Sequence, residues 1–339
     1  MRKAAGVATL VLAVLLAATV VPSHGQAPIK LRQTGFRVLY MAPVYLGIER
    51  GFFREEGIDL EYVEIQSGVL GPASLVGGQA HFSDIDPLQT AELRTQGYSL
   101  LMIYNLVNRV TLDFILRNEV ADRLRVTRQT PLPERFRALR GLNIGITRPG
   151  APTDIFPRYF LRRAGLDPDR DANLVQVGGV PALAAAFRAG RIDGFMLSPP
   201  LPQQLEQEGL GRIIIKNTAG DVPELSNLTY VAHVVTKAFA RNNPRLVRAY
   251  VRGLQRANAW MRQNPTDALR LLHQKYFTDT SPEVLRLSWD ALLPAISRDG
   301  RFTEAGIKAY LNVFETIGQT FRIDTSEGDL WTNEFLSGR

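Results

Sequence analysis

Two stretches of the chain repeat the same order of strand-like and helix-like segments, about 112 residues apart. Residues 78–87 (GQAHFSDIDP) run from glycine through a short extended segment to proline, and residues 190–199 (GRIDGFMLSP) follow the same order at an offset of 112. Gly51 and Gly165 match at an offset of 114, and a third glycine pair matches at 111. Three matches at nearly one offset predict two similar α/β lobes, each a mostly parallel sheet with flanking helices.

The two passes are expected to supply most of the strands. Extended runs fall at residues 29–36, 58–65, 80–85 and 99–104 in the first pass, and at 141–146, 173–177, 192–197 and 212–216 in the second. A β-like run at residues 228–236 is interpreted as the chain crossing back to the first lobe, with the forward crossing near residues 111–117. We therefore assign residues 28–115 and 228–339 to lobe 1 and residues 116–227 to lobe 2.

The first 27 residues have the pattern of a secretory signal peptide. A basic start (Met1-Arg2-Lys3) precedes an uncharged, mostly apolar run at residues 4–21, and small residues follow at Ser23, Gly25 and Ala27. An uncleaved membrane anchor is the alternative, because 18 residues almost span a bilayer. We expect export to the periplasm with cleavage. The net charge of +7 then falls to +5, a mild excess that does not favour a nucleic-acid partner.

The composition and motifs argue against several kinds of chemistry. The chain has no cysteine, which excludes disulfides, cysteine-ligated metals, thiol catalysis and a lipidated N-terminal cysteine. Its four histidines make a histidine-rich metal site unexpected. There is no Walker-type phosphate loop, no G-x-S-x-G elbow and no H-E-x-x-H motif. We therefore expect a monomeric binding protein rather than an enzyme, with no catalytic residues, metal or cofactor.

The turns after the strands are the expected location of function. Ligands of parallel sheets bind beyond the carboxyl ends of the strands, so two lobes are expected to face each other across a ligand cleft. The candidate ligand-binding residues are Phe36, Arg37, Tyr40, Ser67, Gly68, Asp84, Asp86, Arg148, Gly150, Ala151, Thr153, Ser198 and Pro199.

Each kind of side chain in these turns also has a structural alternative. Serine and threonine at helix starts either cap the helix or donate to a ligand. Arg37 and Arg148 can pair with a carboxylate, sulfonate or phosphate, or lie solvated at the surface. Phe36 and Tyr40 can enclose a flat or apolar ligand, or pack in the core. The two aspartates can receive an amine, or cap the helix that starts near residue 87.

Residues 42–60 (APVYLGIERGFFREEGIDL) resemble the opening of the nitrate/sulfonate/taurine and thiamine-precursor substrate-binding proteins of ABC transporters (NMT1/SsuA-like). The resemblance continues at residues 77–80, 139–145, 164–166 and 189–194, and it covers essentially the whole mature chain. His81 departs from the family, whose members usually carry Asp in that Gly-x-x-Asp string, whereas Asp193 keeps it. The pyrimidine-synthase branch depends on a cysteine motif, which this chain lacks.

The resemblance implies a two-lobe periplasmic-binding-protein fold of type II that closes on a small ligand and docks onto a permease in the inner membrane. The expected function is an exported solute-binding protein that delivers a small molecule to an ABC importer. The ligand is expected to be a sulfonate, a carboxylate or another small anion, or a heterocyclic or aromatic compound. Two alternatives stay open: a lyase or hydrolase acting in the cleft, and a ligand-sensing domain of a signalling system.

Overall fold

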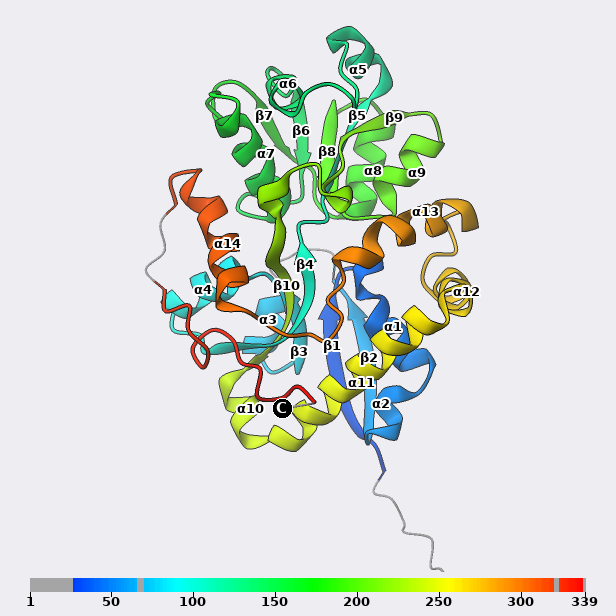
Figure 1. The fold of residues 1–339 in the computed structure, drawn as a ribbon, viewed down its shortest axis with the longest axis vertical. Coiled ribbons are helices and arrows are strands. Elements are labelled where there is room, and N and C mark those ends of the chain that lie inside the picture. Colours follow the sequence, from blue (N-terminus) through cyan, green and yellow to red (C-terminus); the bar gives the residue numbers. More distant parts are fainter. Residues whose placement is uncertain (1–26, 66–69, 320–322, 338–339) are drawn as a thin grey trace, which may run out of the picture.

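The computed structural model, which describes residues 27–65, 70–319 and 323–337, contains two five-stranded sheets, one in each lobe (Figure 1). The first sheet has the order β2-β1-β3-β10-β4 and consists of β1 (Ile29–Gly35), β2 (Ile58–Glu64), β3 (Phe82–Ile85), β4 (Leu100–Arg109) and β10 (Ser226–Thr236). The second has the order β7-β6-β8-β5-β9 and consists of β5 (Asp113–Arg117), β6 (Asn143–Ile146), β7 (Asn173–Gln176), β8 (Gly194–Leu197) and β9 (Gly211–Ile215).

The two sheets have the same topology. β1 pairs in parallel with β2 and β3, and β6 pairs in parallel with β7 and β8. The fourth strand of each sheet, β10 or β5, runs antiparallel to both of its neighbours, so the sheets are mixed rather than purely parallel. Each of these antiparallel strands follows a crossing between the lobes. Since β5 lies wholly in the second sheet, the boundary expected at residue 115 falls inside it, and we propose boundaries near residues 112 and 226.

His81 and Asp193 occupy equivalent positions in the two lobes and make the same kind of backbone contact, although their side chains differ. The Asp193 carboxylate accepts the backbone N–H of Asn143 at 2.7 Å, and the N–H of Asp193 donates to the carbonyl of the same residue. In the first lobe, His81 Nδ1 accepts the N–H of Arg32 at 3.0 Å, and the N–H of His81 donates to the Arg32 carbonyl. The imidazole therefore replaces the carboxylate as an acceptor, so Asp193 has a structural role and the departure at His81 preserves it.

Helices cover both sides of the sheets (Figure 1). Those of the first lobe before the crossing are α1 (Ala42–Glu49), α2 (Phe52–Glu55), α3 (Leu70–Val76) and α4 (Pro87–Thr95). Those of the second lobe are α5 (Asn118–Leu124), α6 (Leu132–Arg137), α7 (Pro152–Arg163), α8 (Val180–Arg188) and α9 (Leu201–Gln207). After β10 come α10 (Lys237–Asn242), α11 (Pro244–Gln263), α12 (Pro265–Lys275), α13 (Pro282–Leu292) and α14 (Glu304–Glu315). Among the described residues, no helix has the length and hydropathy that crossing a bilayer requires.

The Arg-rich stretch at residues 119–140 contains two short helices, α5 and α6, on the second lobe. Its arginines are not all solvated. Arg135 is buried and donates to the Ile214 carbonyl at 2.9 Å and to Asp221 at 2.7 Å. Arg128 donates to the same carboxylate at 3.1 Å. These two guanidinium groups hold the loop after β9 against α6, so part of the basic stretch has a structural role.

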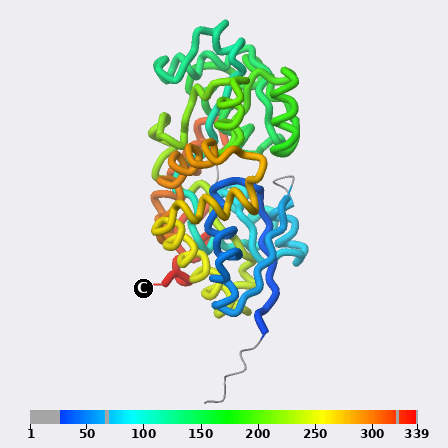
Figure 2. The backbone as a smooth tube through the Cα atoms, turned by 90° about the vertical axis from the view of Figure 1, so that its right-hand side faces the viewer, coloured from blue at the N-terminus to red at the C-terminus, as the bar shows by residue number. Residues whose placement is uncertain are grey.

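The lobes meet at the crossing segments and at α13, which lies at their junction in Figure 1 and in the side view of Figure 2. α13 contacts α9 of the second lobe as well as α12 and the turn Leu39–Met41 of the first. Asp113, at the start of β5, is buried and accepts the Thr218 N–H at 3.0 Å and the Gln203 side chain at 2.7 Å. This carboxyl group thus joins the forward crossing to the segment through which the chain returns.

Candidate ligand-binding site

A cavity of about 100 Å³ lies where the strand ends of the two lobes face each other. Residues that follow β1 and β3 supply the wall from the first lobe, and residues that follow β6 and β8 supply the wall from the second. Its lining is Phe36, Val38, Tyr40, Ile65, Asp84, Ile85, Asp86, Gln89, Leu112, Thr147, Arg148, Ala151, Pro152, Thr153, Val180, Leu197, Ser198, Tyr230 and Val231.

Eight of the thirteen predicted residues line this cavity: Phe36, Tyr40, Asp84, Asp86, Arg148, Ala151, Thr153 and Ser198. Three lie beside it. Arg37 points outward and pairs with Glu64 at 3.1 Å, the Gly150 N–H donates to Asp154 at 2.8 Å, and the Pro199 carbonyl accepts the Leu39 N–H at 3.3 Å. Ser67 and Gly68 lie outside the described residues.

Asp84 stands at the carboxyl end of β3, half-buried beside the cavity. Its Oδ2 accepts a long hydrogen bond of 3.3 Å from the Tyr40 hydroxyl, and its Oδ1 is buried with no hydrogen-bond partner in the described part of the chain. Gly35 on β1 leaves room for this carboxyl group, because a Cβ there would lie 2.3 Å from Oδ1. Burial raises the pKa of Asp84 to about 8, against the opposing effects of its own backbone N–H and of the Tyr40 hydroxyl.

Asp86, two residues further on, already accepts a hydrogen bond from within the protein. It caps α4, accepting the Gln89 N–H at 2.9 Å, so the capping interpretation of this residue is confirmed. Burial raises the pKa of Asp86, while the Gln89 N–H, the Tyr310 hydroxyl and the charge of Arg148 act in the opposite direction. Asp86 therefore has less capacity left for a ligand than Asp84.

Arg148 extends from the turn after β6 and is the cation among the residues that line the cavity. One terminal nitrogen donates to the Pro149 carbonyl at 3.0 Å. Its Nε is buried and has no hydrogen-bond partner within the described ranges. A buried donor on a guanidinium group is costly to leave unpaired, so this nitrogen is the feature of the second lobe best suited to an acidic ligand.

The hydroxyl groups of the second lobe hold the wall together. Thr153 Oγ1 accepts the Thr147 N–H at 3.0 Å and lies 2.8 Å from the Thr147 hydroxyl, and it does not cap α7. Ser198 Oγ lies 2.7 Å from the Thr111 hydroxyl. Both side chains are buried. Among the residues that the structure describes, no three side chains from His, Asp and Glu come together as a metal site.

The comparison with known proteins agrees with this architecture. Residues 29–272, well over half of the chain, match the NMT1-like family. The chain belongs to this family. The match begins at β1 and ends in α12, so it includes both sheets and every residue that lines the cavity.

Relatives of the chain include two proteins of Synechococcus elongatus. The nitrate/nitrite binding protein NrtA is 26% identical over 284 residues, which are 78% of this chain and 63% of NrtA. The bicarbonate-binding protein CmpA is 24% identical over 263 residues, which are 72% of this chain and 57% of CmpA. The chain therefore spans about three-fifths of the length of these relatives.

The fold is shared with the solved structure of the alkanesulfonate-binding protein SsuA of Xanthomonas axonopodis pv. citri bound to MOPS. The TM-score is 0.69 at 17% identity, covering 86% of this chain and 94% of SsuA. At this identity the likeness concerns the fold, and it confirms the expected two-lobe binding-protein architecture of this NMT1-like chain.

Eleven of the nineteen lining residues were not among the predicted ones, and several of these come from elements that the prediction did not use. Tyr230 and Val231 come from β10, and Leu112 comes from the forward crossing. The sequence predicts both crossing segments. Because these segments run between the lobes, residues at the cleft could have been expected in them. Gln89 lies in the first turn of α4, where a residue three positions after the strand-end loop still faces the cavity.

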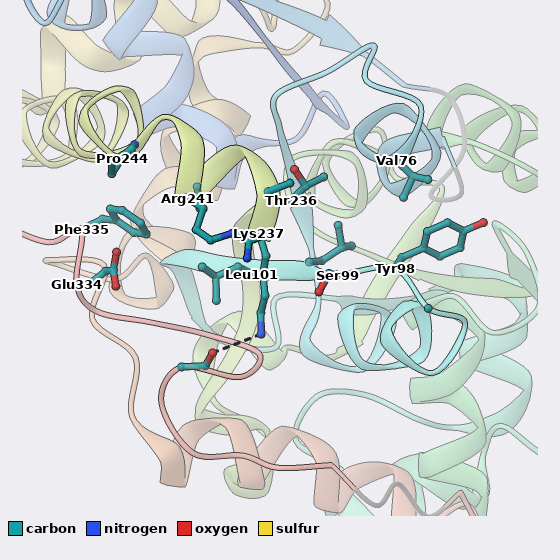
Figure 3. A pocket seen from close by; sticks show the side chains of 15 residues that line it. Val76, Tyr98, Ser99, Leu101, Thr236, Lys237, Arg241, Pro244, Glu334 and Phe335 are labelled. Carbon is teal, nitrogen blue, oxygen red and sulfur yellow. Dashed lines mark hydrogen bonds between the residues drawn. The ribbon is translucent and has the colours of Figure 1, made fainter.

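A second, larger hollow of about 620 Å³ lies on the first lobe of this family member (Figure 3). It is lined from Gly97 to Leu101, by α10 and by Phe335 near the C-terminus. Lys237 donates from it to the Gly328 carbonyl at 3.4 Å (Figure 3). None of its lining comes from the second lobe and none is a predicted site residue, so the smaller cavity between the lobes is the candidate site.

Proposed function

We propose that the protein is an exported solute-binding protein that delivers a small molecule to an ABC importer. The cavity that both lobes share carries the proposal, because a ligand there contacts strand ends of both sheets at once. The names of NrtA and CmpA support it, since both describe proteins that bind a small solute.

The ligand is proposed to act by favouring the closed arrangement of the lobes. Contacts to both lobes exist only when they are close together, so a bound solute shifts an open–closed equilibrium towards closure. The Leu39 N–H donates to the Pro199 carbonyl across the junction, and Gln207 of α9 donates to Glu283 of α13 at 3.1 Å. These bonds are expected to break on opening, with bending at the crossing segments that Asp113 joins.

A small acid is the proposed ligand, such as a carboxylate or a sulfonate. A cavity of about 100 Å³ suits a solute of a few non-hydrogen atoms, well below the several hundred Å³ of typical sites for drug-sized molecules. Arg148 offers its buried Nε to the acid group, while Phe36 and Tyr40 supply apolar surface. A flat heterocycle that carries an acid group also meets these conditions.

A thermal-shift screen of small acids and aromatic compounds tests this proposal. We expect at least one small acid to raise the melting temperature of the wild-type protein, and Arg148→Ala to abolish about 90% or more of that affinity, since charged hydrogen bonds contribute roughly 1.5–3 kcal/mol. Arg188→Ala is the matched control. Arg188 lies on the same lobe, exposed and paired with Glu208 at 2.8 Å, and its loss leaves the shift unchanged. Equal binding by the Arg148 variant would remove this residue from the site.

Export and docking complete the proposal. The signal peptide expected at residues 1–27 lies almost wholly outside the described residues, and the periplasmic location, the permease partner and the monomeric state are proposed with it. N-terminal sequencing of the protein recovered from the periplasm would identify the cleavage site. Recovery only from the membrane fraction would favour an uncleaved anchor.

The enzyme alternative also predicts acids with raised pKa in the cleft, and Asp84 and Asp86 meet that condition. The hydroxyl of Ser198, however, is hydrogen-bonded to Thr111, and neither histidine nor lysine is among the described residues that line the cavity. The same screen separates the two functions. Recovery of a stabilising compound unchanged after long incubation supports binding, and conversion of that compound supports an enzyme.

A further inference from the structure

Asp84 has an environment that the proposed function does not explain. Its carboxyl group lines the cavity, and one of its oxygens is buried without a partner in the described part of the chain. No described lysine or arginine lowers its pKa, whereas the charge of Arg148 lowers the pKa of Asp86. Tyr40 supplies one long hydrogen bond. A carboxyl group at a ligand cavity is therefore left with unused acceptor capacity.

The groups that surround Asp84 leave this acceptor capacity unused. Burial raises the pKa of five tyrosines that surround this residue, and the charge of Asp84 raises their pKa further. They come from the turn after β1, from α1, β2, β10 and α11: Tyr40, Tyr45, Tyr62, Tyr230 and Tyr250. Three of these hydroxyls are used elsewhere. The Tyr62 and Tyr45 hydroxyls donate to the Phe36 carbonyl at 2.7 and 3.2 Å, and the Tyr250 hydroxyl donates to Gln33 at 2.7 Å. These tyrosines surround the carboxyl group without supplying a positive charge.

The two sides of the cavity offer a ligand opposite hydrogen-bonding groups. Arg148, on the second lobe, offers one unpaired donor, Nε, and Asp84, on the first lobe, offers one unpaired acceptor, Oδ1. A solute without a hydrogen-bond donor would place its negative charge beside the buried carboxylate. The repulsion between the two charges would disfavour its binding. A solute with a donor at its other end would satisfy the same carboxylate.

We infer that Asp84 is a specificity-determining residue that selects small acids carrying a hydrogen-bond donor, such as an amino group, and that in its ionised form it rejects donor-free anions. The inference rests on the proposed function and concerns the solute that the cavity accepts. It separates this chain from a receptor for a simple inorganic anion, since nitrate has no proton to offer the carboxylate.

The selection is expected to depend on pH, because burial raises the pKa of Asp84 to about 8. The other titratable or charged groups around it are the five tyrosines, Tyr310 on α14, Asp86 after β3, His233 on β10 and Arg148 on the second lobe. Burial keeps the pKa of these tyrosines above 10 and lowers the pKa of His233 to about 3, so they stay neutral between pH 6.5 and 8.5. Below pH 8 the Asp84 carboxyl holds its own proton and tolerates an anion better.

Calorimetric titration of the wild-type protein with β-alanine and with propanoate tests the inference, because these acids differ by one amino group. At pH 8.5 we expect β-alanine to bind about 10- to 100-fold more tightly than propanoate, and nitrate to bind no better than propanoate. At pH 6.5 the ratio should be smaller. Asp113, whose pKa is about 7, lies away from the cavity lining and affects both acids alike, so the ratio isolates Asp84.

Asp84→Asn provides the second arm, since the amide keeps the shape and removes the charge. It should bring the two affinities within about threefold of each other at both pH values, by weakening β-alanine and strengthening propanoate. Asp59→Asn is the control, because Asp59 is on β2, pairs with Arg54 and lies outside the cavity; it should keep the wild-type ratio.

Three results would overturn the inference. These are equal binding of both acids by the wild-type protein at pH 8.5, an unchanged ratio in Asp84→Asn, and binding of neither acid. The proposed function is judged separately by the wider screen with Arg148→Ala. Tight binding of propanoate or nitrate, for example, would refute the role of Asp84 and still support a solute-binding protein.

Discussion

Replacement of Trp289 by alanine is expected to lower the free energy of unfolding by about 3–5 kcal/mol, the usual cost of removing a buried aromatic side chain from a core. Trp289 is 2% exposed and lies on α13, the helix at the junction of the lobes. It belongs to a core cluster with members from both sheets, including Phe82 and Phe114. The cavity left behind would loosen the junction, so ligand affinity should fall as well. Urea unfolding followed by fluorescence measures the first effect.

Trp260→Ala is the matched control for this prediction. Trp260 is only half-buried, with the Arg50 guanidinium 4.8 Å from its ring and Phe52 at its edge. Because less surface returns to water, its loss should cost about 1 kcal/mol and should leave ligand affinity unchanged. Equal costs for the two substitutions would show that α13 does not hold the lobes together.

The repeat in the sequence predicted the strands that begin each lobe, because their apolar residues and the glycines that end the preceding helices are local signals. The pairing of the last strands is not local. β4 extends to Arg109 rather than ending near residue 104. Its extension contains Asn105, whose N–H donates to the Gly300 carbonyl and whose side chain donates to the Arg301 carbonyl at 3.2 Å. Partners about 195 positions away therefore stabilise this part of β4. Its polar residues gave no sequence signal for a strand.

The candidate site shows a similar division. Position after a strand was enough to predict Phe36, Asp84, Arg148 and Ser198, since the carboxyl ends of parallel strands meet at one edge. The direction of a side chain within such a turn was not predictable. Arg37 follows Phe36 directly and yet points to solvent, where Glu64 pairs with it. An arginine next to the site and an arginine in it have the same sequence signature.

Raising the pH from 6.5 to 8.5 is expected to lower the free energy of unfolding of the ligand-free protein by about 2 kcal/mol. Burial raises the pKa of Asp84 to about 8 and that of Asp113 to about 7, while in the unfolded chain both lie near 4. Within this window the folded protein therefore binds more protons than the unfolded chain, and stability falls as pH rises, by about 1.4 kcal/mol per unit for each such group. The loss ends once the pH passes the folded pKa of Asp84.

Between pH 6.5 and 8.5, other titratable groups change the free energy of unfolding only a little. His81 and His233 have lowered pKa values and change stability in the opposite direction, but mainly below about pH 6.5. Denaturant midpoints across the window measure the slope, and Asp84→Asn should remove most of it. Asp221→Asn is the control: its pKa is lowered by Arg128 and other donors against the effect of burial, so its loss destabilises the protein without changing this slope. Stability that rises with pH would contradict the raised pKa of Asp84. If a ligand amine occupies this carboxylate, saturating β-alanine should lower its pKa and flatten the slope, which ties the stability of the fold to the selection of the solute.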